Sequence, residues 1–451
     1  MHENVKIIVD IPNLNNYGDI SAGIGVAERM IAKGYDVGIW TPNDPQKTVE
    51  SKIIQIYGRQ YEPRIMQSDD WDYSGKYITI SYNLDGTTYI QKLKTIAAIR
   101  LTEYDQKFGY CKCKKTLYEN PNGPSQVPAT SKIITINAGL SFKRPSEGAP
   151  NMQLGSGLFL SDEFEARLKQ GMKRKALAME LIKRFELGEN SSLGKFLLQH
   201  AQDSNWALFY PSGLPVQPAY FDILGEAENR LKNKLTVFSI SGNNDNKKQV
   251  QNAAEKNKFS YCDARSKSRR DFSNEKVTVI ELGILPNRIF QDLLMQADAP
   301  SVITGNHSLT QALQKIFSKN KTPASPILYQ SAPWLQYTAK NLIQLLDAID
   351  YEIAQDFSAY LQESQADYLY ADFDSASKIK NLERLFYHEP YIKKYNSAFC
   401  ELEQKIKEEI KNAGFKNEEV LFSNLDTIEY AVEQIIHQGK NPQEIYADFT
   451  A

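Results

Sequence analysis

Residues 5–34 read VKIIVDIPNLNNYGDISAGIGVAERMIAKG and contain the pattern that decides the fold: an apolar run, a loop and a helix. The run at 5–11 is short and rich in β-branched residues, which is typical of a buried strand. A helix follows and ends at Gly34. Its apolar residues recur at helical spacing: Ile24, Ala27, Met30 and Ile31. A strand that leads through a loop into a helix is the repeating unit of a parallel α/β sheet.

The same alternation continues through the first part of the chain. We expect further strands at 35–41, 51–57, 76–82, 95–101 and 131–139. The polar segment LYENPNGPSQVPAT at 117–130 predicts a loop. The apolar spacing of 161–188 predicts one amphipathic helix, capped by Ser161 or Asp162.

A second series of strands and helices starts at residue 204. Its expected strands lie at 204–213, 235–242, 276–286, 299–305 and 326–330, with helices at 218–233, 247–256, 287–297 and 308–317. From Ala339 onward the pattern is almost wholly helical. Two such series in one chain predict an α/β protein of two facing doubly wound, Rossmann-like domains of the GT-B type with a helical C-terminal extension.

The expected ranges are 1–198 and 199–340 for the two α/β domains and 341–451 for the helical extension, which we expect to pack on the cleft or on the domains. In such sheets ligands lie outside the carboxyl ends of the strands, so the cleft between the domains is the expected site. A two-domain α/β protein of another kind, such as a periplasmic-type binding protein or a sugar-nucleotide epimerase, fits the same pattern.

The composition narrows the class of protein. The 451 residues are 41% hydrophobic and 24% charged, with a formal net charge of −2 at pH 7 and four cysteines. This gives no basic field for nucleic acid or a membrane surface, and too few cysteines for a disulfide framework. No apolar run approaches the ~18 residues of a membrane span, and the first residues lack the order of a secretory signal. We expect a cytoplasmic protein without nucleic-acid or membrane partners, and delivery into another cell stays open.

Four segments resemble one family of enzymes, and their order agrees over roughly residues 5–335. They are NNYGDISAGIGVAERMIAKG (15–34), WALFYPSG (206–213), ILPNRIFQDLLMQADAPSVITGNHSLTQA (284–312) and PILYQ (326–330). In these segments the chain resembles the protein-arginine rhamnosyltransferases that modify elongation factor P. The resemblance implies an inverting, metal-independent transfer of a hexosyl or deoxyhexosyl group from a nucleotide-activated sugar, with no cofactor besides that donor. In the family the acceptor is an arginine. The resemblance implies that the acceptor binds to the first domain and that the nucleotide sugar binds to the second.

The chain departs from the family at acidic positions. Where the family has an aspartate before its Asn-aromatic-Gly-Asp run, this chain has Asn15, and only the second aspartate is kept, as Asp19. The family's Arg-Gly-Glu-Asp-Ser is here Thr304 to Ser308, with Asn306 and His307 in place of the two acids. A guanidinium stays protonated at ordinary pH, so several carboxylates are needed to turn it into a nucleophile. These replacements weaken the prediction of an arginine acceptor and of a rhamnose donor.

Asp19 is the candidate general base. An inverting transfer needs one base on the acceptor side, and Asp19 is a carboxylate in a loop whose glycines let a substrate approach the backbone. The resemblance adds Asn15, Tyr17 and Gly18 to the same site. An alternative is that Asp19 only caps the helix, because aspartate is common there.

The segment Gly305-Asn306-His307-Ser308 is the candidate diphosphate site. A strand ends, a glycine turns and a helix begins, so that the first N–H groups of the helix point at an anion. The Ser308 hydroxyl and His307, if protonated, add donors. The alternative is a capped turn with a solvated histidine.

The resemblance also implies which residues contact the nucleotide base. Tyr210 would stack on the base, and Asn287 would form hydrogen bonds with its edge. Gln330, at the end of the last strand, would be a further polar contact. We expect no metal site. The pairs Asp70/Asp72 and Asp372/Asp374 and the pair Cys111/Cys113 lack the context of metal ligands. Gly23, Gly25 and Glu28 form only an incomplete dinucleotide motif.

The sequence is compatible with three functions. The first is a glycosyltransferase that uses a nucleotide sugar, with a protein side chain as the expected acceptor. The second is a sugar-nucleotide hydrolase or epimerase on the same scaffold. The third is a binding or effector protein that has kept the GT-B fold and lost catalysis, which the amides at Asn15 and Asn306 favour.

Overall fold

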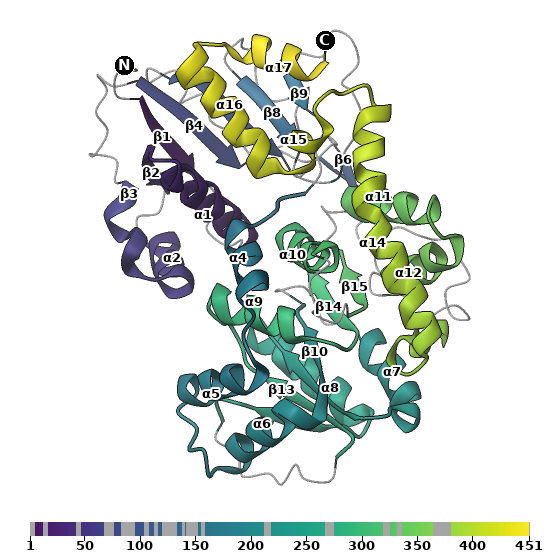
Figure 1. Ribbon diagram of the computed structural model, residues 1–451. Helices are drawn as coiled ribbons and strands as arrows, with labels where there is room; N and C mark the ends of the chain where they lie inside the picture. Colours follow the sequence, from purple (N-terminus) through teal and green to yellow (C-terminus); the bar gives the residue numbers. More distant parts are fainter. Residues whose placement is uncertain are drawn as a thin grey trace. The chain divides into compact units, whose positions relative to one another are not determined.

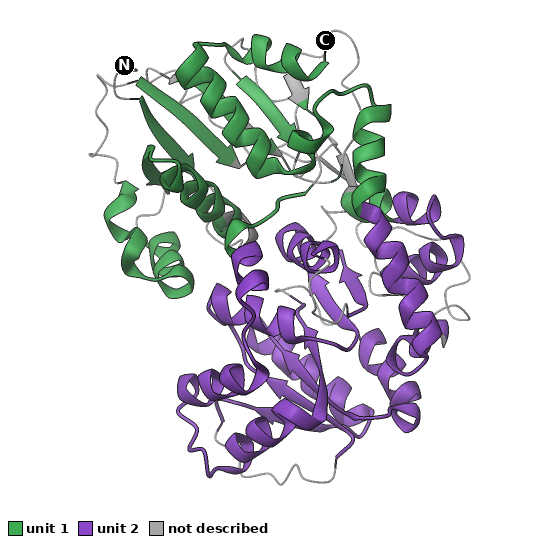
Figure 2. Ribbon diagram, viewed as in Figure 1, with its two compact units in different colours: residues 1–163, 333–342, 403–451 green, residues 164–332, 343–402 purple. Residues whose placement is uncertain are grey.

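The computed structural model shows two compact units, which Figure 2 distinguishes by colour. The structure describes residues 5–450 except 12–16, 42–46, 67–75, 83–94, 103–107, 112–115, 120–132, 138–139, 141–151, 155–157, 212–217, 267–274, 319–324, 332–335 and 364–379. Unit 1 comprises residues 1–163, 333–342 and 403–451, and unit 2 comprises residues 164–332 and 343–402. The division follows contacts rather than chain order, and so it differs from the three consecutive ranges that the sequence predicts.

Unit 1 is built on a seven-stranded sheet in the order β3-β2-β1-β4-β5-β8-β9 (Figure 1). All neighbouring strands in it are parallel. The strands are β1 (Val5–Asp10), β2 (Asp36–Trp40), β3 (Ile65–Met66), β4 (Lys76–Tyr82), β5 (Thr95–Thr102), β8 (Ile133–Asn137) and β9 (Met152–Leu154). A separate antiparallel pair consists of β6 (Phe108–Cys111) and β7 (Thr116–Glu119), and β7 occupies the first residues of the predicted loop at 117–130.

The helices of unit 1 come from both ends of the chain. They are α1 (Tyr17–Ala32), α2 (Thr48–Tyr57), the 3-10 helix η1 (Arg59–Arg64), α15 (Glu418–Phe422), α16 (Asn424–Gln438) and α17 (Pro442–Thr450). The strand expected at 51–57 is wrong, because this segment lies in α2. Val49 and Ile53, one helical turn apart, are its buried residues, so a helical stripe and not an alternating face holds it in place.

Helix α1 begins earlier than the sequence suggested. It starts at Tyr17, so the glycines of the presumed loop lie inside the helix. A Cβ atom on Gly23 would come within 2.7 Å of Cγ1 of Ile11, and one on Gly25 within 3.3 Å of Cε1 of Phe159. The two glycines therefore let α1 approach these side chains closely, and the interpretation that they admit a substrate is corrected.

An ion-pair cluster joins α1 to α16. Nε of Arg29 lies 2.5 Å from Asp162, and its Nη atoms lie 2.8 Å from Asp426 and 2.6 Å from Glu429. Arg29 is partly buried, so these charge-assisted contacts hold the N-terminal helix against the C-terminal segment of the same unit.

Unit 2 is built on a six-stranded parallel sheet in the order β12-β13-β11-β10-β14-β15. The strands are β10 (Ser204–Phe209), β11 (Lys234–Ser239), β12 (Ser260–Asp263), β13 (Val277–Glu281), β14 (Ser301–Thr304) and β15 (Ile327–Gln330). The helices are α5 (Arg174–Arg184), α6 (Ser192–Asp203), α7 (Ala219–Ala227), η5 (Glu228–Arg230), α8 (Asn244–Lys256), α9 (Asn287–Gln296), α10 (Asn306–Phe317), α12 (Tyr351–Glu363) and η7 (Lys380–Phe386). Three helices span a boundary between the units: α4 (Asp162–Gln170), α11 (Gln336–Asp347) and α14 (Glu389–Asn412).

Two predictions about unit 2 need correction. The single helix expected at 161–188 is two helices, α4 and α5, and Gly171 between them has a φ of +60°. A left-handed residue ends a helix, and glycine adopts this conformation without strain. The short edge strand β12 was not predicted, because its four residues include two polar ones.

The predicted fold class is confirmed in its main features. Each unit has a parallel sheet with helices, and the chain from residue 336 onward is helical among the residues that the structure describes. The relative arrangement of the two sheets stays a prediction. No helix among the described residues is long and apolar enough to cross a membrane.

Candidate functional site

The strand order of unit 2 reverses at β10. The chain runs from β10 to β11 on one side, while β14 pairs with β10 on the other. Such a reversal opens a crevice at the carboxyl ends of the two strands, where doubly wound sheets bind ligands. Tyr210 follows β10 directly, and its N–H donates to the carbonyl of Val302 at 2.9 Å. Gly305 follows β14, so both segments that the sequence singled out lie at this crevice.

The turn from β14 into α10 depends on a glycine. Gly305 has φ 85° and ψ 153°, a conformation that is open essentially to glycine alone. It is the N-cap position of α10 and has no side chain to cap the helix, so the first N–H groups of α10 are left to other acceptors. Buried side chains hold the helix behind this end: Leu309, Ala312 and Leu313. The N-terminus of α10 is thus a fixed set of donors at the carboxyl edge of the sheet.

Asn306 is the first residue of α10 and has polar atoms that need partners. Its side chain is 7% exposed, and neither Oδ1 nor Nδ2 has a hydrogen-bond partner among the described residues. Oε1 of Gln311, five residues further along the helix, is also buried and has no hydrogen-bond partner among the described residues. Buried polar atoms are nearly always satisfied in folded proteins, by protein, water or ligand. The beginning of α10 therefore offers hydrogen bonds to a bound polar group.

His307 does not meet the condition under which it would add donors, a protonated ring. Burial lowers the pKa of its imidazole to about 4. Nε2 of His307 lies 3.0 Å from the amide Nε2 of Gln311, which donates to a neutral ring. His307 therefore adds no positive charge for a phosphate at neutral pH, and its side chain is partly buried.

The remaining predicted residues of unit 2 lie around the same edge. Ser308 is buried in the first turn of α10, and Gln330 ends β15, where Oγ1 of Thr304 donates to its Oε1 at 3.5 Å. The ring of Tyr210 packs on Phe290 of α9, with the centroids 4.9 Å apart. Asn287 is the first residue of that helix. Three separate segments thus bring Tyr210, Asn287 and the α10 turn to one end of the sheet.

A buried carboxylate shapes the segment that leads to Asn287. Glu281 ends β13 and accepts hydrogen bonds at 2.7 Å from Oγ of Ser239, at 2.8 Å from Oγ and 3.0 Å from N–H of Ser241, and at 2.8 Å from N–H of Gly283. Gly283 has a φ of +62°. The four donors compensate the buried charge, so Glu281 orients this loop as a structural group.

The residues predicted for the acceptor side belong to unit 1. Tyr17, Gly18 and Asp19 form the start of α1, so Asp19 is in the first helical turn and not in a loop. An acidic residue there is favoured by the helix dipole. Asn15 lies outside the described residues.

No group of three or more His, Cys, Asp or Glu side chains that could hold a metal ion is found among the residues that the structure describes. The pairs Asp70/Asp72 and Asp372/Asp374, with Cys113, lie outside the described residues, and Cys111 ends β6.

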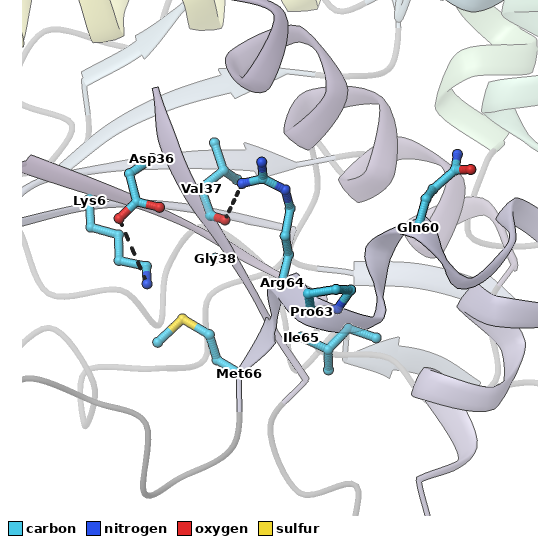
Figure 3. Close-up of a pocket in the computed structure, with 9 residues that line it drawn as sticks. All are labelled: Lys6, Asp36, Val37, Gly38, Gln60, Pro63, Arg64, Ile65 and Met66. Carbon is cyan, nitrogen blue, oxygen red and sulfur yellow. Dashed lines mark hydrogen bonds and ion pairs between the residues drawn. The ribbon is translucent and has the colours of Figure 1, made fainter. Parts of the chain in front are cut away.

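A cavity of about 600 Å³ lies in unit 1 (Figure 3), and its lining includes none of the predicted site residues. It is lined by Lys6, Asp36, Val37, Gly38, Gln60, Pro63, Arg64, Ile65 and Met66. Asp36 begins β2 and is in register with Lys6, the second residue of β1, so both lie at the opposite end of the strands from the carboxyl edge. Arg64 donates to the carbonyl of Val37 at 3.2 Å and Nζ of Lys6 lies 3.9 Å from Oδ2 of Asp36, so both cations of the cavity have partners within the protein.

One functional candidate, Asp10, was not predicted from the sequence. It ends β1, is 9% exposed and accepts a hydrogen bond at 3.1 Å from Oγ of Ser81. The signal was an aspartate at the end of an otherwise apolar strand, VKIIVD.

The fold and the site define a class: a two-unit α/β protein with a helix N-terminus at the switch point of its second sheet. No family model and no curated protein matches the chain. Among solved structures it is similar to a glycosyltransferase from Rickettsia africae (10% identity, 91% of this chain and 100% of that chain, TM-score 0.40). It is also similar to a ugt transferase from Siraitia grosvenorii in complex with UDP (9%, 91% and 100%, 0.42) and to a UDP-forming trehalose-phosphate synthase from Burkholderia xenovorans (9%, 96% and 99%, 0.42). At these TM-scores the likenesses carry no argument about this chain.

Proposed function

We propose that the chain is an inverting, metal-independent glycosyltransferase of the GT-B type that uses a nucleotide-activated sugar. Unit 2 binds the nucleotide diphosphate, and unit 1 binds the acceptor. The sugar is a hexose or deoxyhexose and the acceptor a protein side chain, an arginine by the resemblance to the elongation-factor-P rhamnosyltransferases. The nucleotide sugar is the donor substrate, and no cofactor takes part.

One observation carries the proposal: the N-terminus of α10 at the switch point of the unit 2 sheet. A diphosphate carries negative charge and needs several donors that point at it. The first N–H groups of α10 and the amide of Asn306 supply donors, and Gly305 leaves space because a Cβ atom there would meet nothing within 4 Å. Tyr210 and Asn287 lie at the same edge for the nucleoside.

The reaction balances with the groups that these segments carry. The acceptor atom attacks the anomeric carbon, the new bond to carbon forms, and the bond from carbon to the phosphate oxygen breaks. The electron pair leaves with the diphosphate, which the α10 turn stabilises, and Asp19 takes the proton of the acceptor. Neutral His307 takes no part in compensating charge.

The neutral groups at Asn306 and His307 favour a second candidate, a binding protein that holds a nucleotide without turnover. Product analysis separates the possibilities. A glycosylated acceptor supports transfer, free sugar or an isomer supports a hydrolase or epimerase, and binding without any product supports the binding protein.

The direct test compares two variants. Asp19→Asn keeps the shape and removes the proton acceptor, so turnover falls by ~10²–10⁴ while nucleotide affinity stays the same. Ser308→Ala weakens nucleotide binding by ~0.5–1.5 kcal/mol, the usual worth of one neutral hydrogen bond. Ser318→Ala, at the other end of α10, is the matched control. Full activity of Asp19→Asn would remove Asp19 from the mechanism, since asparagine caps a helix as well as aspartate does.

A further inference from the structure

The sheet of unit 1 has a switch point of its own. The chain runs from β1 to β2 on one side, and β4 pairs with β1 on the other. Asp10 is the last residue of β1 and is in register with Ser81 of β4. The carboxyl group therefore lies where a sheet of this kind binds its ligand.

Asp10 points away from α1. A Cβ atom on Gly23 of α1 would meet Val9 and Ile11, so α1 covers the face to which these two residues point. Successive side chains of a strand point to opposite faces, which places Asp10 on the other face. An apolar cluster on this sheet consists of Ile8, Trp40, Met66 and Tyr77, and Trp40 is in register with Asp10 on the neighbouring strand β2. On the other side of β1, Thr79 and Ser81 of β4 are in register with Ile8 and Asp10.

The polar groups on this face are buried and incompletely bonded. Oδ2 of Asp10 accepts from Ser81, but Oδ1 has no partner among the described residues. Oγ1 of Thr79, on the adjacent strand, is also buried and has no hydrogen-bond partner among the described residues. Burial raises the pKa of Asp10 to about 7. A carboxyl group held in this way costs folding stability, which is typical of groups kept for function.

Glu281 of unit 2 is a buried carboxylate with a structural role, also at the carboxyl end of a parallel strand. It ends β13, the strand next to the edge strand β12, and it accepts hydrogen bonds from Ser239, Ser241 and Gly283. Among the described residues Asp10 has one donor and Glu281 has four, so the two carboxyl groups are held in different ways.

We infer that Asp10 is a ligand-binding group of unit 1, whose Oδ1 accepts a hydrogen bond from an N–H or O–H of the glycosyl acceptor. The inference rests on the proposed function, and it adds a second carboxyl group of unit 1 to the acceptor side. Asp19 takes the proton of the acceptor, while Asp10, with Ser81 fixing its other oxygen, holds the acceptor in place.

The test uses two small probes, argininamide for a cationic N–H donor and glycerol for an O–H donor. Each is added to the full-length protein and to Asp10→Asn, and melting temperature is followed. Asp36→Asn is the matched control, because Asp36 begins the adjacent strand with its side chain 69% exposed. Uridine and thymidine diphosphates are added separately to all three proteins.

We expect at least one probe to stabilise the parent protein and Asp36→Asn but not Asp10→Asn, and the active probe identifies the donor. A ¹³C carboxyl signal absent from Asp10→Asn should move on adding that probe, which a structural role would not cause. Equal probe responses in all three proteins, or none in any, would overturn the inference. The nucleotide response tests the proposed function independently, since it should be the same in all three proteins.

Asp10→Asn should fold, because it removes the cost of a buried charge and keeps an oxygen for the Ser81 hydroxyl. If it does not, Ser81→Ala replaces it as the test variant. This variant frees the carboxyl group and should weaken the response to the active probe, and an unchanged response would again overturn the inference.

Discussion

Gly305→Ala is the most informative change at the candidate site. Gly305 has φ 85° and ψ 153°, and a Cβ atom there would meet nothing within 4 Å. The cost is therefore backbone strain alone, about 1–3 kcal/mol for this region. Replacing glycine also reduces the conformational entropy of the unfolded chain, which stabilises the folded state by about 0.4–1 kcal/mol. We expect a net loss of about 0.5–2 kcal/mol in the free energy of unfolding, measured by urea denaturation.

The same variant should bind nucleotide more weakly. Relief of the strain turns the first N–H groups of α10 away from their fixed positions, and each hydrogen bond lost costs about 0.5–1.5 kcal/mol, a factor of roughly 2–12 in affinity. Titration with uridine, guanosine and thymidine diphosphates measures this.

Gly439→Ala is the control for strain without the site. Gly439 has a φ of +67°, ends α16 in unit 1, and also has open space around it. It should lose a similar amount of stability, about 1–2 kcal/mol, with no change in nucleotide affinity. Equal nucleotide affinities for both variants and the parent protein would refute the assignment of the α10 N-terminus as the diphosphate site.

The remaining predictions concern stability and metal dependence. Burial raises the pKa of Glu28 from 4.5 to about 7, so the folded state favours the protonated form and loses stability as pH rises through this range. Glu28→Gln should remove this loss, about 3 kcal/mol at most, when urea unfolding is compared at pH 5 and pH 8. Lys315→Met should destabilise by about 1–3 kcal/mol, because the carbonyl groups of Leu294 and Ala297 lose a buried donor, and a normal melting temperature would contradict this. Gly23→Ala should destabilise by about 1–3 kcal/mol through overpacking, despite the better helix propensity of alanine, whereas a gain in stability would contradict the close contact. Nucleoside diphosphates should raise the melting temperature equally with and without EDTA, and stabilisation that requires Mg²⁺ would contradict the metal-independent mechanism.

Alternating apolar runs and helical stripes were enough to predict most of the two sheets. The expected strand at 76–82 matches β4 (Lys76–Tyr82) residue for residue, and the expected strand at 326–330 contains β15 (Ile327–Gln330). Buried parallel strands are short, continuous apolar runs, and local sequence records them directly. The α10 turn was also predictable, because Gly305 separates an apolar strand from a helical pattern.

Predictions from local sequence were wrong where a short apolar run fits both a strand and a helix. Residues 51–57 fit a strand as well as a helix, and only burial of Val49 and Ile53 on one stripe made them α2. The glycines of α1 have the composition of a loop, but the close contact between Gly23 and Ile11 shows that packing requires them. Such contacts join residues distant in sequence, and no local pattern records them.

Two parallel α/β sheets, a glycine at the start of α10 and the positions of the ionisable residues can be read from the amino-acid sequence alone. Which of the ionisable groups are charged, and which have hydrogen-bond partners, depends on the tertiary structure. Burial makes His307 neutral and raises the pKa of Asp10, because an ionised group loses its hydration in the interior. Four donors from neighbouring segments satisfy Glu281, while Asp10, also at the carboxyl end of a strand, has one donor among the described residues. Charge and hydrogen bonding depend on what surrounds a side chain in space, and the chain order of this protein does not contain that information.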